Sequence, residues 1–325
     1  MRIAVLGSGS WGSALSIHFG RSGFEVIQWC REKEVAEEIN EKGENRTYLP
    51  GFTYPEGVRA TGSVLEALEG ADVVFSVIPA QYSYPFWREN RELLKNKKLV
   101  CSSKGIDVER LKTLSELYKD LFKSIENYYV LSGPTFAKEV AEGLPAAAVL
   151  SNESPERALE MVRNLSTPNF RLYASGDVKG VELGGALKNV IAIATGISDG
   201  MGFGNNARAA LITRGLHEIK RLGRKLGARE ETFYGLSGLG DLVLTCTGDL
   251  SRNRQFGISL SRGEKRKGNF VVEGVYTVKA VHSLARELSV EMPISEGVYK
   301  IIYEGVEPKK VIEELLSRPV KEENR

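Results

Sequence analysis

Hydrophobic and polar positions change their pattern about midway along the chain. The first half carries short, nearly continuous apolar runs, which are typical of parallel strands covered on both faces. Predicted strands lie at residues 2–6, 25–30, 71–78, 98–103, 128–132, 146–150 and 170–173. The second half carries long helical patterns, at residues 181–197, 206–226, 273–288 and 308–316. We therefore predict an α/β fold, with a doubly wound Rossmann-type sheet over residues 1–177 and an all-helical domain over residues 178–325.

A glycine-rich segment separates the first predicted strand from a helical pattern. It reads Gly7-Ser8-Gly9-Ser10-Trp11-Gly12. In a unit of this kind the first glycine permits a tight turn, the second lets the backbone approach a pyrophosphate, and the third lets helix and strand pack closely. Purely structural turns share the spacing, but the position between a strand and a helix, with a second strand following, favours dinucleotide binding.

The end of the second predicted strand bears on the choice of cofactor. An arginine there accommodates the 2′-phosphate of NADP, whereas an acidic residue binds the ribose 2′-hydroxyl of NAD. The chain reads Cys30-Arg31-Glu32. Arg31 favours NADP(H), while Glu32 could contact the ribose and keeps NAD(H) open. The plain alternative is a surface arginine that pairs with Glu34.

One charged side chain, Lys188, interrupts an otherwise small and apolar helical run from Leu183 to Ser198. Apolar residues cover most sides of this helix, so we expect Lys188 to be buried. Burial disfavours the ammonium ion and lowers its pKa, which suits a lysine to acid–base chemistry near neutral pH. The alternatives are a lysine at a helix end that reaches solvent, or one that pairs with a structural carboxylate.

Other candidates for binding an anion follow a strand or lie in a loop. Lys104 leaves its predicted strand at the sheet edge where ligands bind in open α/β folds. In the predicted loop 248–254, Arg252 offers a planar fork for a phosphate, Asn253 a neutral donor and the Ser251 region backbone N–H groups. Solvated loop side chains are the alternative for all of these. Two further glycine-rich loops are predicted at residues 199–206 and 238–241.

Net charge and cysteine content indicate which partners and which cellular compartment to expect. The 44 basic and 42 acidic residues give a formal net charge of +2, so we expect neither nucleic acid nor an anionic membrane as a partner. Met1 leads directly into a strand without a signal peptide, and no apolar run is typical of a membrane span, so we expect a cytoplasmic protein. Three isolated cysteines and three histidines indicate neither disulfides nor a metal site.

Five motifs spread along the chain resemble those of the NAD(P)-dependent glycerol-3-phosphate dehydrogenases, and the resemblance covers essentially the whole chain. They are Gly7–Gly12, Asn45–Gly51, Ser132–Glu139, Gly185–Val190 and Gly240–Leu242, and the block from Gly185 to Leu211 is the most specific. The resemblance implies cofactor contacts at Ser10, Trp11, Arg31, Lys104, Ala137, Arg252, Val271 and Glu273. It implies substrate contacts at Lys104, Gly133, Thr135, Lys188, Asp241, Ser251, Arg252 and Asn253, with Lys188 as the catalytic proton acceptor.

The activity implied by this resemblance is the interconversion of dihydroxyacetone phosphate and sn-glycerol 3-phosphate, which feeds glycerophospholipid synthesis. Lys188 would protonate the developing alkoxide and Lys104 would stabilise it or orient the substrate. Asp241 would hold and tune Lys188, unless it caps the helix that follows. The expected partner is a small phosphorylated substrate, and a homodimer is left open. Two alternatives remain: a hydroxyacid or ketopantoate type of dehydrogenase, and a non-catalytic NADPH sensor.

Overall fold

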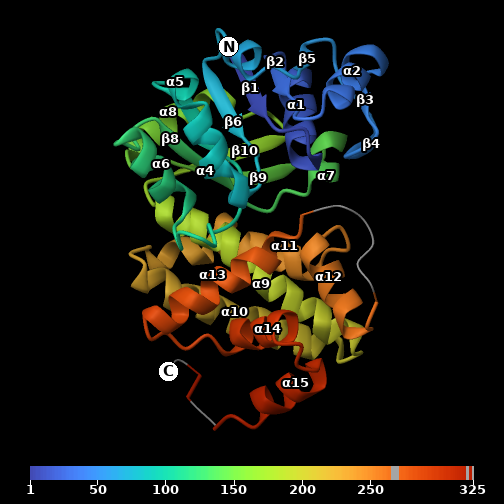
Figure 1. Ribbon diagram of the computed structural model, residues 1–325, viewed down its shortest axis with the longest axis vertical. Helices are drawn as coiled ribbons and strands as arrows, with labels where there is room; N and C mark the ends of the chain where they lie inside the picture. Colours follow the sequence, from blue (N-terminus) through green and yellow to red (C-terminus); the bar gives the residue numbers. More distant parts are fainter. Residues whose placement is uncertain (265–270, 320–321, 324–325) are drawn as a thin grey trace.

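The chain folds into an α/β unit and a helical unit, which lie one above the other in Figure 1. The computed structural model describes residues 1–264, 271–319 and 322–323. The N-terminus lies on the α/β unit, and the helical unit ends with α15 (Pro308–Leu316) at the opposite end of the molecule (Figure 1). Each unit is continuous in sequence, and the chain passes from the first to the second after β10 (Phe170–Ser175).

The α/β unit is built on an eight-stranded sheet with the order β10-β9-β8-β7-β6-β1-β2-β5. Its other strands are β1 (Arg2–Leu6), β2 (Glu25–Trp29), β5 (Val58–Thr61), β6 (Val73–Ser76), β7 (Lys98–Cys101), β8 (Tyr128–Ser132) and β9 (Ala146–Ser151). Neighbouring strands pair in parallel except β8 and β9, which are antiparallel, so β9 and β10 run against the rest. The predicted α/β fold is confirmed, with this reversal at one edge. An apolar run has the same pattern in either direction, so the sequence could not show the reversal.

Helices cover both faces of the sheet, as its continuously apolar strands require. They are α1 (Ser10–Arg21), α2 (Lys33–Lys42), α3 (Val64–Leu68), α4 (Ala80–Glu89), α5 (Arg91–Leu94), α6 (Leu114–Phe122), α7 (Ala137–Glu142) and α8 (Pro155–Leu165). A small hairpin, β3 (Glu44–Asn45) with β4 (Leu49–Thr53), lies beside α1 and α2 (Figure 1). The sequence analysis missed this hairpin and β5, because their strands are short and none carries a continuous apolar run.

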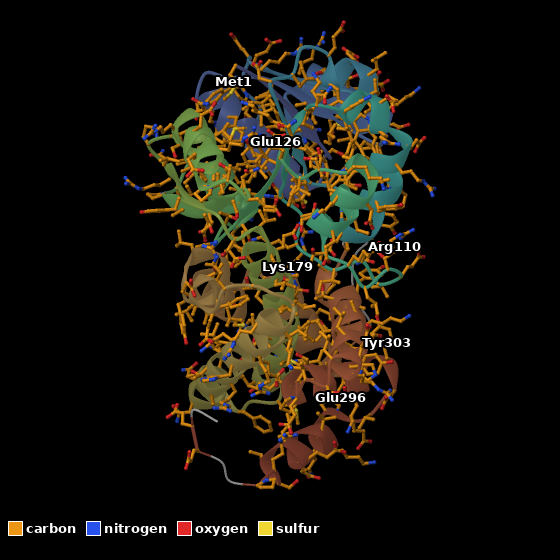
Figure 2. All side chains as sticks on the ribbon, turned by 90° about the vertical axis from the view of Figure 1, so that its left-hand side faces the viewer. Met1, Arg110, Glu126, Lys179, Glu296 and Tyr303 are labelled. Atoms are coloured by element: carbon orange, nitrogen blue, oxygen red, sulfur yellow. The ribbon has the colours of Figure 1, made fainter. Side chains whose placement is uncertain are left out.

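The helical unit is arranged around α9 (Val178–Gly200), which α10 (Gly204–Lys225), α11 (Asp241–Thr247), α12 (Arg252–Ser261), α13 (Glu273–Glu287) and α14 (Pro293–Tyr303) surround. Asp177 caps the start of α9 by accepting a hydrogen bond from the N–H of Gly180 at 2.9 Å. Lys179, the second residue of α9, lies at the level where the two units meet in Figure 2, below Glu126 and above Glu296. The first turn of α9 therefore joins the units.

Three predicted loops are shorter than expected. The loop predicted at residues 248–254 ends at Ser251, because α12 begins at Arg252. The segment 199–206 is mostly helical, since α9 continues to Gly200 and α10 begins at Gly204. Residues 238–241 are also helical: a wide helical turn, Leu236–Gly240, leads directly into α11, and Asp241 is the first residue of that helix rather than its cap. The latter two segments were predicted as loops from their glycines. Close packing accounts for two of them, Gly200 against α12 and Gly238 against the backbone of Phe233, whereas Gly202 and Gly204 have positive φ, as in a turn.

Helix α9 is long and apolar enough, by length and composition, to cross a membrane, and it is the one such helix in the described ranges. However, 94% of its apolar window is buried inside the protein. Its neighbours approach at glycines: a Cβ on Gly196 would lie 2.0 Å from the carbonyl oxygen of Arg254 in α12, and one on Gly184 2.6 Å from that of Ser237. It is therefore the core helix of the helical unit.

Candidate active site

Two lysines and one aspartate meet where the sheet edge faces α9. The carboxylate of Asp241 accepts a hydrogen bond from Lys188 Nζ at 2.5 Å through Oδ1, and one from Lys104 Nζ at 2.6 Å through Oδ2. Lys104 comes from the α/β unit, whereas Lys188 and Asp241 come from the helical unit. One carboxylate thus holds two ammonium groups side by side across the junction of the units.

Burial makes this cluster chemically unusual. Lys188 is 6% exposed and Asp241 only 1%. Burial lowers the pKa of Lys188 from 10.5 to about 8; the carboxylate of Asp241 opposes this shift and the charge of Lys104 adds to it. A lysine with such a pKa is present both as an ammonium ion and as an amine near neutral pH, so it can donate or accept a proton. The predicted burial of Lys188 is confirmed.

Glycines and a hydroxyl shape the surroundings of the two lysines. A Cβ on Gly185 would lie 2.5 Å from Ser132 Oγ and 3.4 Å from Lys104 Cγ, so a glycine here lets the Lys104 chain lie against α9. Thr245, one turn after Asp241 on α11, accepts a hydrogen bond from Lys188 Nζ at 2.7 Å. The sequence analysis missed Thr245. Its spacing of four residues from Asp241, on the same helix face, is the signal that could have found it.

The loop after β8 supplies the remaining neighbours of Lys104. Lys104 Nζ donates a second hydrogen bond to the carbonyl oxygen of Gly133 at 3.0 Å, and Thr135 Oγ1 donates to the same oxygen at 3.2 Å. Gly133 packs tightly, since a Cβ there would lie 2.7 Å from Ala148 Cα. The structure therefore brings Lys104, Gly133, Thr135, Lys188 and Asp241 together.

The glycine turn has the shape that a dinucleotide requires. Gly7 has a φ of +130°, and a Cβ on Gly12 would lie 2.1 Å from the carbonyl oxygen of Gly7, so neither position accepts a side chain. A Cβ on Gly9 would meet nothing within 4 Å, which leaves the backbone open at the N-terminus of α1. These three glycines and the free helix N-terminus fit a pyrophosphate.

The hairpin β3–β4 supports this turn, and the sequence analysis gave its residues no such role. Asn45, which is fully buried, donates through Nδ2 to the carbonyl oxygen of Ser8 at 2.8 Å and to Ser13 Oγ at 2.9 Å. Ser10 Oγ donates to the carbonyl oxygen of Tyr48 at 2.6 Å and accepts from Arg252 Nη2 at 2.7 Å. Ser10 therefore joins the turn, the hairpin and α12.

The three residues at the start of α12 have different roles in the structure. Ser251 caps the helix by accepting the N–H of Arg254 at 3.2 Å, and Arg252 extends to Ser10. Asn253 is buried, donating to Asn189 Oδ1 at 2.9 Å and accepting the N–H of Gly274 at 3.0 Å. Asn253 thus ties α12 to α9 one residue after Lys188. The other arginine of this segment, Arg254, is bound to Asp199 and Asp249.

Glu273, the first residue of α13, is half-buried and extends its carboxylate toward the α/β unit, between the start of α4 and the loop that follows β7. Its Oε1 accepts the N–H of Ala80 at 3.3 Å, and its Oε2 finds no hydrogen-bond partner among the described residues. Burial raises the pKa of Glu273 from 4.5 to about 7, against the effect of the Ala80 bond. An unpaired buried oxygen at the carboxyl ends of the strands fits the polar group of a bound nicotinamide.

The remaining predicted cofactor residues lie on several elements. Trp11 is half-buried on α1, Ala137 is the first residue of α7, which packs against α1, and Val271 is half-buried just before α13. Arg31 is exposed after β2 and pairs with its neighbour Glu32, not with Glu34. An apolar cavity of about 720 Å³ lies away from this site, between α10, α14 and α15.

A dinucleotide-binding turn and a buried lysine of lowered pKa come from different units and face one junction, which is the organisation of a two-domain nicotinamide-dependent dehydrogenase. The chain belongs to the NAD-dependent glycerol-3-phosphate dehydrogenase family: the sequence model of that family's N-terminus matches residues 2–158, and the model of its C-terminus matches residues 177–313. The family expected from the sequence motifs is thereby confirmed.

Individual relatives agree with this assignment. The chain is 48% identical over 330 residues to the glycerol-3-phosphate dehydrogenase (NAD(P)+) of Nitratidesulfovibrio vulgaris (strain DP4), with 99% of this chain and 100% of that protein covered. The solved glycerol-3-phosphate dehydrogenase of Coxiella burnetii is 38% identical, with a TM-score of 0.93 over 98% of this chain and 99% of that one. A ketopantoate reductase of Ralstonia eutropha JMP134 is 13% identical, with a TM-score of 0.61 over 96% of this chain and 100% of that one, and shares the fold alone.

Proposed function

We propose that the chain interconverts dihydroxyacetone phosphate and sn-glycerol 3-phosphate with a nicotinamide cofactor, the reaction for which its family is named. The observation that carries the proposal is the pair of lysines on the buried carboxylate of Asp241, at the edge of a sheet whose first turn fits a pyrophosphate. A ketone that accepts a hydride must also receive a proton on its oxygen, and the Lys188 ammonium ion of this cluster can donate that proton.

Lys188 is the proton donor in the direction of ketone reduction and the proton acceptor in the direction of alcohol oxidation. Its pKa of about 8 lets both forms exist at neutral pH. Asp241 and Thr245 hold its Nζ in place, so the proton is delivered at a defined position. Lys104 adds a second positive charge beside the oxygen on which negative charge develops, which stabilises the transition state.

The cofactor residues are those around the turn and the strand ends. When bound, the nicotinamide ring supplies or takes the hydride. Gly7, Gly9 and Gly12 shape the pyrophosphate site, with Ser10 and Trp11 beside it. Arg31 lies where the adenine ribose is bound in this fold, and Glu273, with Val271 and Ala137, completes the site. We propose NADP(H) as the preferred cofactor because of Arg31, with NAD(H) also accepted.

The substrate phosphate is the remote group that positions the reacting carbon. Arg252 carries the planar cation that suits a phosphate, Ser251 begins the helix α12 beside it, and Asn253 is held next to α9. Gly133 and Thr135 border the Lys104 side of the site. The proposal is supported by the position of all these residues at one junction, and it extends to a cytoplasmic enzyme that feeds glycerophospholipid synthesis, acting alone or as a homodimer.

A steady-state assay of nicotinamide absorbance tests this function. Dihydroxyacetone phosphate should be reduced with NADPH and, less efficiently, with NADH. Unphosphorylated dihydroxyacetone should be a poorer substrate by at least about tenfold in kcat/KM, the loss expected for one charge-assisted contact. Equal rates with both ketones would instead support a dehydrogenase for another substrate class, and no oxidation of NADPH by any ketone would support a sensor.

A further inference from the structure

Arg31 and Glu32 form an ion pair at the carboxyl end of β2. The guanidinium donates to the carboxylate through both Nε, at 2.9 Å, and Nη2, at 2.5 Å, and both bonds end on the same oxygen, Oε1. The Arg31 side chain is 75% exposed and that of Glu32 30%. One of the two edges by which the guanidinium could bind a phosphate, the edge formed by Nε and Nη2, is therefore already occupied by a neighbouring carboxylate.

The pair lies at the position where this fold binds the adenine ribose of a dinucleotide. β2 is the strand next to β1, and the N–H of Gly7 in the glycine turn donates to the carbonyl oxygen of Trp29 at 3.0 Å. Glu32 follows Gly12 by about 20 residues, the spacing at which an acidic residue binds the ribose 2′-hydroxyl. Tyr48 faces the same carboxylate: burial first, and then the charge of Glu32, raise the pKa of that tyrosine.

We propose that Glu32 determines how strongly the enzyme prefers NADP(H), by competing with the 2′-phosphate for the Arg31 guanidinium. This inference rests on the proposed cofactor use of the site. With NAD(H), Glu32 can accept the 2′-hydroxyl while it stays paired with Arg31. With NADP(H), the phosphate replaces Glu32 on Arg31, and the two negative groups are left close together. The Arg31–Glu32 pair thus allows both cofactors to bind and keeps the difference between their affinities small.

The energetics of the pair support such an exchange. An exposed ion pair of adjacent residues contributes little to stability, so it opens at small cost. A phosphate carries more negative charge than a carboxylate and accepts a two-pronged bond from arginine, so it displaces Glu32 when present. Opening the pair, and the repulsion between Glu32 and the 2′-phosphate that remains, weaken the binding of NADP(H) and leave the binding of NAD(H) unchanged.

The variant Glu32→Gln tests the proposal by binding rather than by turnover. Calorimetry would measure the dissociation constants of two fragments, adenosine 2′,5′-bisphosphate and 5′-AMP, and of NADP+ and NAD+. Both ligands with a 2′-phosphate should bind about two- to fivefold more tightly, the range that corresponds to an exposed charge pair. The ligands with a free 2′-hydroxyl should bind equally well or more weakly.

Glu34→Gln is the matched control, because it removes the same charge two residues away on an exposed position in the first turn of α2. It should shift the affinity for the 2′-phosphate ligands less than Glu32→Gln does. Equal effects of the two variants, or a parallel change for all four ligands, would overturn the proposal. If the unchanged protein bound neither fragment, the cofactor assignment itself would fail, which distinguishes that outcome from a failure of the competition alone.

Discussion

Lys188 is a buried amine whose proton is held between a carboxylate and a hydroxyl. Replacing it by alanine removes the donor at the reacting oxygen and leaves the cofactor site untouched. For Lys188→Ala we expect kcat to fall by about 10²- to 10⁴-fold, the usual worth of general acid–base catalysis, with the dissociation constant for NADPH unchanged. Stopped-flow reduction of dihydroxyacetone phosphate and fluorescence titration with NADPH would measure the two quantities.

Lys179→Ala provides the comparison for this loss. Lys179 lies on the same helix, α9, and pairs with Glu116 away from the cluster. Its removal should leave kcat nearly unchanged. If Lys188→Ala kept more than about a tenth of kcat, less than general acid–base catalysis predicts, Lys104 would become the leading candidate for proton transfer.

Asp241 sets the pH at which Lys188 changes its charge. Its carboxylate raises the pKa of Lys188 against burial, so Asp241→Asn should lower that pKa below about 8. Ketone reduction needs the ammonium ion, so its rate should fall as pH rises through the lysine pKa, and this fall should move to lower pH in Asp241→Asn. Alcohol oxidation needs the amine, so its rise with pH should move in the same direction. Profiles of kcat against pH in both directions would show the shift; unmoved profiles would mean that another group controls them.

At the scale of elements, the contact between α9 and α12 depends on the absence of side chains. A Cβ on Gly257 would lie 2.2 Å from the carbonyl oxygen of Ile193 and 2.9 Å from the N of Ile197, both backbone atoms of α9. For Gly257→Ala we expect a loss of about 1 to 3 kcal/mol in the free energy of unfolding, the cost of an overpacked core, although alanine favours a helix. Denaturant unfolding would measure it.

Gln255→Ala, on the exposed side of α12, is the control for this substitution. It should change the free energy of unfolding by no more than about 0.5 kcal/mol, as surface substitutions usually do. Gly257→Ala also presses on α9 within two turns of Lys188, so kcat should fall with it. A variant as stable as the unchanged protein would show that the helices can move apart at no cost.

At the scale of the whole molecule, Arg252 links the helical unit to the glycine turn. Its guanidinium donates to Ser10 Oγ across 242 positions of sequence. For Arg252→Ala we expect KM for dihydroxyacetone phosphate to rise about 10- to 100-fold, as for a lost charge-assisted contact, and the dissociation constant for free NADPH to change less. Steady-state kinetics and fluorescence titration would separate the two.

Arg262→Ala offers a matched control, since Arg262 stands at the other end of α12 and is more than half exposed. Neither constant should change in that variant. A fall in cofactor affinity without a change in KM would assign Arg252 to the cofactor alone and would remove it from the substrate phosphate.

The features that could be predicted from the sequence are those that depend on residues close together along the chain. The glycine turn depends on residues within one strand–turn–helix unit, and the burial of Lys188 depends on the apolar residues of its own helix, so both could be predicted. The same local patterns predicted seven of the sheet strands and four helices of the second half, α9, α10, α13 and α15, but missed α11, α12 and α14. They could not predict the direction of β9 and β10 or the hairpin β3–β4, because strand direction and short edge pairing depend on packing.

The partners of each side chain were decided by the tertiary structure. Lys104 and Asp241 are 137 positions apart in sequence, and Lys188 and Asp241 are 53 apart. The sequence by itself determined that Lys188 would be buried and that the first turn would suit a dinucleotide. Only the tertiary packing that brings α9, α11 and the loop after β7 together placed both lysines on one carboxylate and set the lysine pKa. The physical reason is that electrostatic interactions depend on distance and burial in space, not on spacing along the chain.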